Sequence, residues 1–329
     1  MSEWQEVRLG DVLDKIVGGG TPSKENPSYW DGGDIFWCSV KDMSDDKFRI
    51  LQTKDTITLD GLNNSSANLI PKGTVITATR MGLGRAFINE TDMAINQDLK
   101  ALIPNSNINN KYLLWTIILY RNYIEMLGNG ATVKGIRLET LKNIKINLPP
   151  LPAQQKIAKI LSNYDDLIEN NLKRIKLLEE SARLTYEEWF LRFRIDGKKL
   201  EIDSDTGLPF GWECKLMKDF GEVVTGKTPS TDNESYYGGD IPFVKTPSMH
   251  GNTYTLETAD YLTNLGANSQ QNKFLSKNSL MVSCIGTAGV YSLVAGNCQT
   301  NQQINSIRFY KDEYTFYIYG FAGHLTNVL

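Results

Sequence analysis

The sequence has few of the residues on which metal sites and many hydrolases depend. Among its 329 residues are two histidines, His250 and His324, and neither has another histidine or a cysteine at the spacing of a zinc site. Four cysteines are scattered along the chain without a C-x-x-C pair: Cys38, Cys214, Cys284 and Cys298. This pattern is typical of free thiols in a reducing cytoplasm and predicts no metal site.

Long apolar runs are also missing, since none approaches the roughly 18 residues that a membrane span needs. The opening stretch MSEWQEVRLGDVLDK is charged and amphipathic, without the apolar core of a signal peptide. Hydrophobic residues make up 41% of the chain and aromatics 10%, which is enough for packed cores. We therefore expect a globular, cytoplasmic protein with no membrane partner.

A strong positive charge is absent as well, because the formal net charge is −3. Residues 201–329 are the acidic part, with 8 lysines and arginines against 13 aspartates and glutamates. No segment forms a basic tail. Any contact with a polyanion must therefore use local basic patches or help from a partner subunit.

The stretch GEVVTGKTPS (221–230) matches G-x-x-x-x-G-K-[ST], the pattern of a phosphate-binding P-loop. A P-loop should open a helix whose N-terminus faces the phosphates. Here TPSTDNESYYGGDIP follows, and its prolines and paired glycines indicate a loop that leads into a strand. The context therefore argues against a nucleotide hydrolase.

An internal repeat strengthens this argument. Residues 18–43 align with residues 225–249, Ile95-Asn96-Gln97-Asp98 aligns with Thr300-Asn301-Gln302-Gln303, and the segment at Trp4 aligns with that at Trp212. In the first copy Gly19 and Gly20 stand where the second has Gly226 and Lys227. Two equivalent loops that differ in the phosphate lysine predict that the P-loop match is chance.

Between the copies, Pro152 stands where a helix start tolerates proline, and no further glycine or proline occurs before Arg194. Large apolar residues recur there at alternating spacings of three and four, which predicts a coiled-coil stripe. The stripe residues are Ile157, Leu161, Tyr164, Ile168, Ile175, Leu178 and Trp189. The alternative is a charged helix in solvent. We expect a first domain at 1–151, a long spacer helix at 152–196, a linker at 197–211 and a second domain at 212–329.

Three features occur together: a Trp4 opening segment, a G-x-TPS…GG-x-I-x-[FW] motif in both copies, and a LPPLPAQQKIAKIL junction into the long helix. Together they resemble the specificity subunit of type I restriction-modification systems over essentially the whole chain. The resemblance implies an α+β fold with two repeated target-recognition domains joined by a long coiled-coil-type helix. Each domain would read half of a split target in double-stranded DNA. The subunit would be non-catalytic and would dock methyltransferase and restriction translocase subunits.

The first copy departs from the second at its end, because it continues through GNGATVKGIRLETLKNIKINLPP past the point that matches Leu329. We therefore expect the second domain to lack its closing segment and a second spacer helix. The unpaired stripe would then recruit another copy of the chain or a methyltransferase helix.

Candidate DNA contacts lie in hydroxyl-bearing or glycine-flanked basic loops, where arginine is the best bidentate reader of guanine. In the first copy they are Thr21, Ser23, Lys24, Lys41, Arg80, Arg85, Asn96, Gln97, Thr132, Lys134 and Arg137. In the second copy they are Lys227, Thr228, Ser230, Lys245, Asn301 and Gln302. Each has an alternative role as a cap or turn former. Because Arg80 aligns with Ile285 and Arg85 with Val290, the two copies are expected to read different half-sites.

Catalytic motifs are not found. NLPPLP (147–152) lacks the aromatic residue of an adenine methyltransferase motif, no G-x-G-x-x-G follows a strand, and the acid pair at Asp45 is expected to be solvated surface. The sequence therefore predicts a non-enzyme without a cofactor. Two other possibilities remain, a helix-mediated assembly scaffold and an inactive partial allele that does not bind DNA alone.

Overall fold

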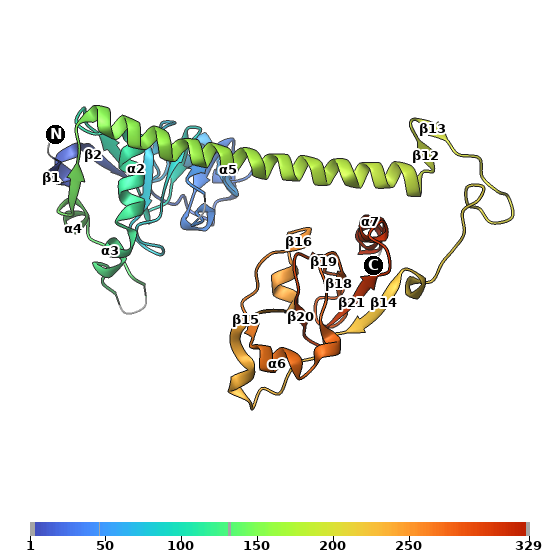
Figure 1. Ribbon diagram of the computed structural model, residues 1–329. Helices are drawn as coiled ribbons and strands as arrows, with labels where there is room; N and C mark the ends of the chain where they lie inside the picture. Colours follow the sequence, from blue (N-terminus) through green and yellow to red (C-terminus); the bar gives the residue numbers. More distant parts are fainter. Residues whose placement is uncertain (1–3, 46, 131–132, 327–329) are drawn as a thin grey trace. The chain divides into compact units, whose positions relative to one another are not determined.

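The chain folds as two compact units, residues 1–174 (unit 1) and 175–329 (unit 2) (Figure 1). The structure is a computed structural model that describes residues 4–45, 47–130 and 133–326. No helix among these described residues is both long enough and apolar enough to span a bilayer.

Unit 1 is an α+β fold. Its strands are β1 (Gln5–Arg8), β2 (Leu13–Gly18), β3 (Ile35–Cys38), β4 (Arg49–Ile50), β5 (Asp55–Ile57), β6 (Leu69–Ile70), β7 (Val75–Ala78), β8 (Ala86–Asn89), β9 (Met93–Ile95), β10 (Leu99–Pro104) and β11 (Lys145–Leu148). Five form a sheet in the order β2-β10-β7-β8-β4, four form a second in the order β5-β3-β9-β6, and β1 pairs with β11. Its short helices are α1 (Leu59–Asn63), α2 (Asn110–Leu119), α3 (Arg121–Met126) and α4 (Leu138–Lys142).

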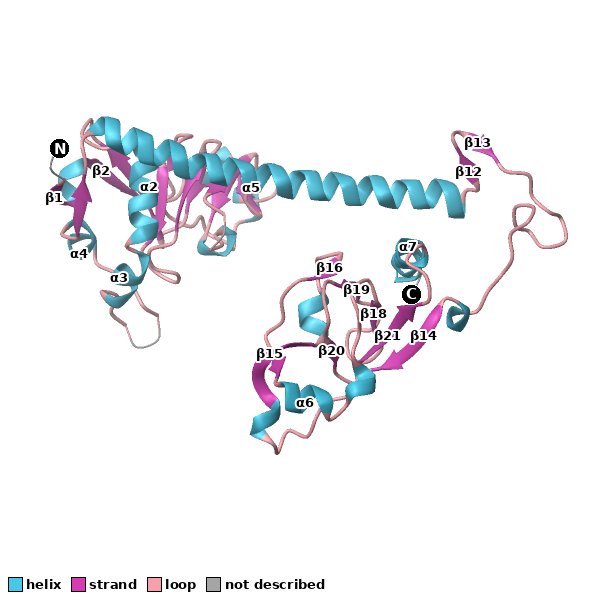
Figure 2. Ribbon diagram, viewed as in Figure 1, coloured by secondary structure: helices cyan, strands magenta, loops and turns pink. Residues whose placement is uncertain are grey.

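The five-stranded sheet is apolar on both faces. Val75 lies opposite Leu102 and Ile76 opposite Ala101 in the antiparallel β7-β10 register. Successive side chains of a strand point to opposite faces. The pair of Val75 and Leu102 therefore packs with Leu113 of α2, and the pair of Ile76 and Ala101 packs on the other face with residues of β9. The helix α2 contacts β7 and β8, and Figure 2 shows it beside strands of unit 1. Unit 1 therefore has a core on each side of one sheet.

The long helix α5 (Leu151–Tyr186) begins at the proline junction that the sequence indicates. Gln154 is buried and makes three hydrogen bonds there. Its Nε2 donates to the carbonyl oxygens of Asn107 (3.0 Å) and Pro149 (2.8 Å), and its Oε1 accepts from the backbone N–H of Asn109 (2.8 Å). One glutamine thus ties the start of α5 to the loop before α2.

We expect Gln154→Leu to lower the free energy of unfolding of the chain by about 2 kcal/mol, because buried backbone groups would lose their partner. Urea unfolding followed by tryptophan fluorescence would measure the change. Gln155→Leu is the matched control, since Gln155 is exposed. Equal stability of the two variants would contradict the role assigned to Gln154.

Beyond its first turns α5 has a largely exposed apolar stripe. Ile157 packs against the unit 1 core. Farther along, Tyr164 is 64% exposed, Ile168 56%, Ile175 52% and Leu178 67%. Helical residues end with a π-helical turn at Glu187–Leu191, and Phe193 follows with φ of 52°. The expected spacer helix extends to residue 196, whereas the helical residues end at Leu191 and a hairpin of β12 (Arg194–Ile195) and β13 (Lys198–Lys199) begins at Arg194.

Unit 2 repeats the strand order of unit 1. Its strands are β14 (Gly221–Thr225), β15 (Tyr237–Val244), β16 (Tyr254–Thr255), β17 (Tyr261–Leu262), β18 (Leu280–Ser283), β19 (Tyr291–Val294), β20 (Gln299–Thr300) and β21 (Ile304–Phe309), and its helices are α6 (Asn264–Asn268) and α7 (Tyr314–Thr326). The sheet β14-β21-β18-β19-β16 corresponds to β2-β10-β7-β8-β4, and β17-β15-β20 corresponds to β5-β3-β9. The sequence repeat is thus a repeat of fold.

An aromatic cluster joins the end of α5 to the rest of unit 2. Phe190 contacts Tyr186, Trp212 and Tyr317, with ring centroids 5.0, 5.8 and 4.8 Å apart. The Cα of Gly320 in α7 lies so close to Tyr186 that a Cβ there would overlap the ring. The aromatic residues at and just after the end of α5 therefore pack, partly buried, against α7 within unit 2.

Candidate nucleic-acid interface

The threonine loop that opens each repeat is bonded to the Asn-Gln turn of the same copy. Thr21 Oγ1 donates to Gln97 Oε1 at 2.6 Å, and Thr228 Oγ1 donates to Gln302 Oε1 at 2.5 Å. The backbone N–H of Gly20 donates to the Ile95 carbonyl oxygen (2.9 Å). Both copies therefore bring together two segments that are more than 70 residues apart.

A glycine two residues before each threonine allows the backbone of the two segments to approach closely. A Cβ on Gly19 would overlap the carbonyl oxygen of Ile95, and one on Gly226 would overlap that of Asn301. Lys227 donates its backbone N–H to Thr300 (2.9 Å), and a 3₁₀ turn at Glu234–Tyr236 follows instead of a long helix. The residues that match the P-loop pattern therefore form a turn that is hydrogen-bonded to residues 300–302, in agreement with the interpretation from the repeat.

The asparagine of the turn is buried in both copies and uses both ends of its amide. Asn96 Oδ1 accepts from the Asp98 N–H (3.1 Å) and Asn96 Nδ2 donates to Asp98 Oδ2 (3.3 Å). In unit 2, Asn301 makes the same two contacts with Gln303, at 3.2 and 2.9 Å. Although the sequence suggests DNA contacts at Asn96 and Asn301, here these side chains shape the turn. Gln97 and Gln302 are exposed beside them.

In unit 1 the β7-β8 hairpin contacts this turn and also residues 133–137, the described C-terminal part of the basic loop. Thr79 donates its N–H to the Asp98 carbonyl oxygen (2.8 Å), and Arg80 forms a β-bridge with Gly135. The next residue, Met81, donates its N–H to the Lys134 carbonyl oxygen (3.4 Å) and is 58% exposed. One edge of unit 1 thus gathers the threonine loop, the Asn-Gln turn, the hairpin tip and the basic loop.

The two hairpin arginines differ in their surroundings. Arg80 lies 3.5 Å from Asp98 and keeps 54% of its side chain exposed. Arg85 lies 2.7 Å from Asp45, which also pairs with Arg121 at 3.0 Å. The hydrogen bond from Arg121 is the main cause that holds the pKa of the Asp45 carboxyl below its usual range, and Arg85 adds to it. Asp45 is therefore an ion-pair centre and not a free surface acid, and one edge of Arg85 is already occupied.

The remaining candidates have the following places. Ser23, Lys24, Lys41, Lys134, Arg137, Lys227 and Ser230 are exposed. Lys24 Nζ lies 6.0 Å from the centre of the Trp30 ring, whereas Lys245 pairs with Asp260 at 2.9 Å. Thr132 lies outside the described residues. The exposed lysines and arginines of this group can therefore be reached by a ligand, whereas Lys245 is already paired with an acid.

Sequence reasoning missed Asp98 as a member of this group. The signal was present, because the repeat aligns Asp98 with Gln303 and Arg80 with Ile285. A charged pair in one copy therefore corresponds to an uncharged pair in the other.

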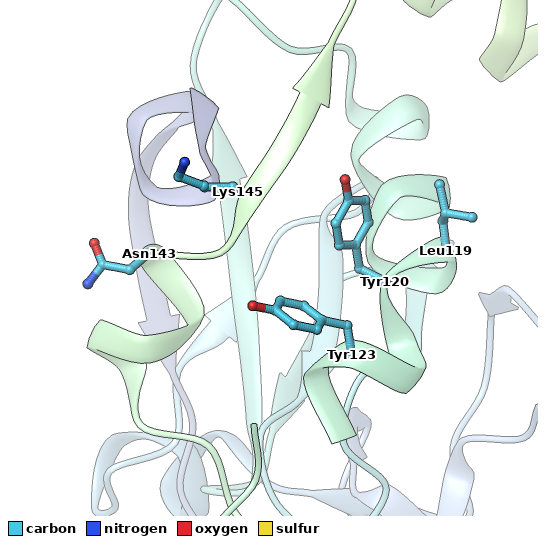
Figure 3. A pocket seen from close by; sticks show the side chains of 5 residues that line it. All are labelled: Leu119, Tyr120, Tyr123, Asn143 and Lys145. Carbon is cyan, nitrogen blue, oxygen red and sulfur yellow. The ribbon is translucent and has the colours of Figure 1, made fainter. Parts of the chain in front are cut away.

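A hollow of about 390 Å³ lies elsewhere on unit 1, lined by Leu119, Tyr120, Tyr123, Asn143 and Lys145. Figure 3 shows the ring of Tyr123 directed toward the segment that carries Asn143 and Lys145, while Leu119 points away. Lys145 Nζ is paired with Glu6 at 2.6 Å. None of these residues belongs to the candidate interface.

Comparisons with known proteins agree on one family. The family model described as "Type I restriction modification DNA specificity domain" matches residues 1–180 and 209–328. The chain is 27% identical to the type I restriction enzyme HindI specificity subunit of Haemophilus influenzae, over 93% of this chain and 79% of that protein. It is 28% identical to the MjaIX specificity subunit of Methanocaldococcus jannaschii, over 85% of this chain and 65% of that protein.

A solved structure has the same fold. The crystal structure of the type I restriction-modification S subunit from M. genitalium matches with a TM-score of 0.55 and 14% identity, over 99% of this chain and 78% of that one. At this identity the likeness concerns the fold alone.

Proposed function

Because the chain belongs to the type I restriction modification DNA specificity family, we propose that it recognises a bipartite sequence in double-stranded DNA. Units 1 and 2 would each read one part. The observation that carries the proposal is the convergence of four loops at one edge of unit 1, with the threonine loop and Asn-Gln turn repeated in unit 2. Paired recognition domains on a shared scaffold are what a two-part target requires.

The side chains at this edge suit two kinds of contact. Exposed Ser23, Lys24 and Lys41 can hydrogen-bond phosphates, which set the register of a protein on the duplex. Arg80 presents a half-exposed guanidinium, the group best suited to the O6 and N7 acceptors of guanine. Its counterpart Ile285 is 58% exposed and cannot make that contact. The two units would therefore prefer different sequences.

We propose that the chain acts without catalysis of its own. Both matched relatives are specificity subunits of type I restriction enzymes. Methyltransferase and restriction subunits would supply the chemistry after docking on this chain. The exposed stripe of α5 suits such docking or self-association, because Tyr164, Ile168 and Leu178 are each more than half exposed.

The test is to co-express the chain with its methyltransferase subunits and to map the methylated sites in the host DNA. A reproducible two-part motif would support the proposal. An absence of any motif from an active methyltransferase assembly would favour a pure assembly scaffold or an inactive allele.

We expect Arg80→Ala to weaken the preference at one base of the unit 1 half-site by about 1–3 kcal/mol, because a bidentate contact is lost. Lys24→Ala is the matched comparison. It should lower affinity evenly across sequences and flatten the salt dependence, because phosphate contacts release counterions but carry little sequence information. Binding titrations of the assembled complex at several salt concentrations would measure both effects. Unchanged titrations for both variants would show that these loops do not face DNA.

A further inference from the structure

The guanidinium of Arg80, at the hairpin tip, forms an ion pair with Asp98 on one side and is exposed to solvent on the other. Its Nη1 lies 3.5 Å from Asp98 Oδ1, and the Asp98 side chain is only 11% exposed, against 54% for Arg80. A guanidinium has five N–H donors, so one carboxylate contact leaves most of them free. Arg80 therefore combines an inner anchor with an outer, solvent-facing edge.

The anchor itself is fixed by the fold. The backbone N–H of Asp98 is bonded to Asn96 Oδ1 (3.1 Å), and its Oδ2 accepts from Asn96 Nδ2 (3.3 Å). Its carbonyl oxygen accepts from the N–H of Thr79 (2.8 Å) and from Thr79 Oγ1 (3.1 Å). The Asp98 backbone is thus tied to the residue that directly precedes Arg80, and Asn96 holds the carboxylate beside it.

The second copy shows that the turn does not need the acid. Gln303 takes the place of Asp98, keeps both contacts with Asn301, and accepts the N–H of Cys284 (2.8 Å) as Asp98 accepts that of Thr79. The residue opposite Arg80 is Ile285. The acid thus occurs where the arginine occurs and is replaced where the arginine is replaced.

We propose that Asp98 is a positioning residue that orients Arg80 toward a guanine in the unit 1 half-site. The proposal rests on the DNA-recognition function proposed above. An arginine that is already held in one orientation loses less side-chain freedom on binding, so the contact favours its base more strongly. A guanine offers the O6 and N7 acceptor pair that matches the open edge of the guanidinium. Arg80 and Asp98 thus form one specificity unit, and Ile285 and Gln303 form its uncharged equivalent.

The experiment uses the full chain assembled with its methyltransferase subunits and a randomised double-stranded DNA library. The variants are Asp98→Gln, Arg80→Ala and the double variant. Gln is chosen because unit 2 keeps the same turn with glutamine at this position. Wild type should select a guanine at one position of one half-site, and Asp98→Gln should lower that preference about tenfold. In the Arg80→Ala background, Asp98→Gln should change the preference no further.

Two measurements separate positioning from mere folding. The melting temperature of Asp98→Gln should stay near that of wild type, and its affinity for random DNA should not fall, because a negative charge has been removed from the edge. Two results would overturn the role assigned to Asp98 and leave the proposed function standing. One is an unchanged base preference in Asp98→Gln, and the other is that Asp98→Gln lowers the preference equally in the wild-type and Arg80→Ala backgrounds. If wild type enriches no sequence at all, the proposed function fails and the assignment fails with it.

Discussion

The double variant Ile168→Asp/Leu178→Asp is expected to weaken association through α5 by about 3 kcal/mol or more, which is roughly a hundredfold in the association constant. Ile168 is 56% and Leu178 67% exposed, on the stripe with alternating three- and four-residue spacing. Burying such a side chain contributes about 1.5–3 kcal/mol, and a carboxylate at the same place would oppose burial. Light scattering of the chain alone, and of its mixture with methyltransferase subunits, would measure the loss.

The matched control is Asn163→Asp/Asn170→Asp. These residues are exposed and lie about 100–120° around α5 from the mean direction of Ile168 and Leu178 at 3.6 residues per turn, so they add the same charge beside the stripe and not on it. The control should associate as wild type does. A wild-type chain that remains monomeric and binds the methyltransferase no better than the stripe variant would show that the stripe is not an interface.

Gly226→Ala is expected to lower the free energy of unfolding by about 3 kcal/mol, at the upper end of the usual cost of overpacking. Its new methyl group would overlap the carbonyl oxygen of Asn301, and backbone cannot move aside as a flexible side chain can. The hydrogen bond from Thr228, two residues farther along, to Gln302 in the Asn-Gln turn should weaken as well. Urea unfolding would measure the loss.

Lys227→Ala is the natural comparison, because Lys227 is exposed and its backbone bond to Thr300 survives the substitution. It should leave stability near that of wild type and should change no nucleotide affinity. Tight nucleotide binding that disappears in Lys227→Ala would revive the P-loop interpretation. A stable Gly226→Ala would instead contradict the close contact described for this glycine.

The large-scale organisation could be predicted from the sequence because it depends on patterns that recur. The alignment of residues 18–43 with residues 225–249 anticipated two copies of one fold, and the strand orders of the two units agree with it. The long helix followed from a run without glycine or proline after Pro152. Its end is less predictable, because the stop depends on the positive φ of Phe193 and on the aromatic contacts of Phe190.

The candidate site was only partly predictable, because residue type does not reveal a partner distant in sequence. Arg80 and Arg85 look equivalent in ATRMGLGR, yet Arg85 is paired with Asp45, far upstream, while Arg80 keeps an open edge. Asn96 has the side chain of an adenine reader and also that of a turn former. Only the burial of its amide distinguishes these roles.

The turns that join the loops have a consequence for how such a chain can diversify. The bonds from Thr21 to Gln97 and from Thr228 to Gln302 are the same in both units, while the hairpin tips carry Arg80 in one and Ile285 in the other. Under the proposed function, the side chains that hold the turn and those that would read the DNA are therefore different residues. Under this proposal a tip residue could be exchanged for another without unfolding the domain, since the turn that both units share keeps the frame on which the tip is presented.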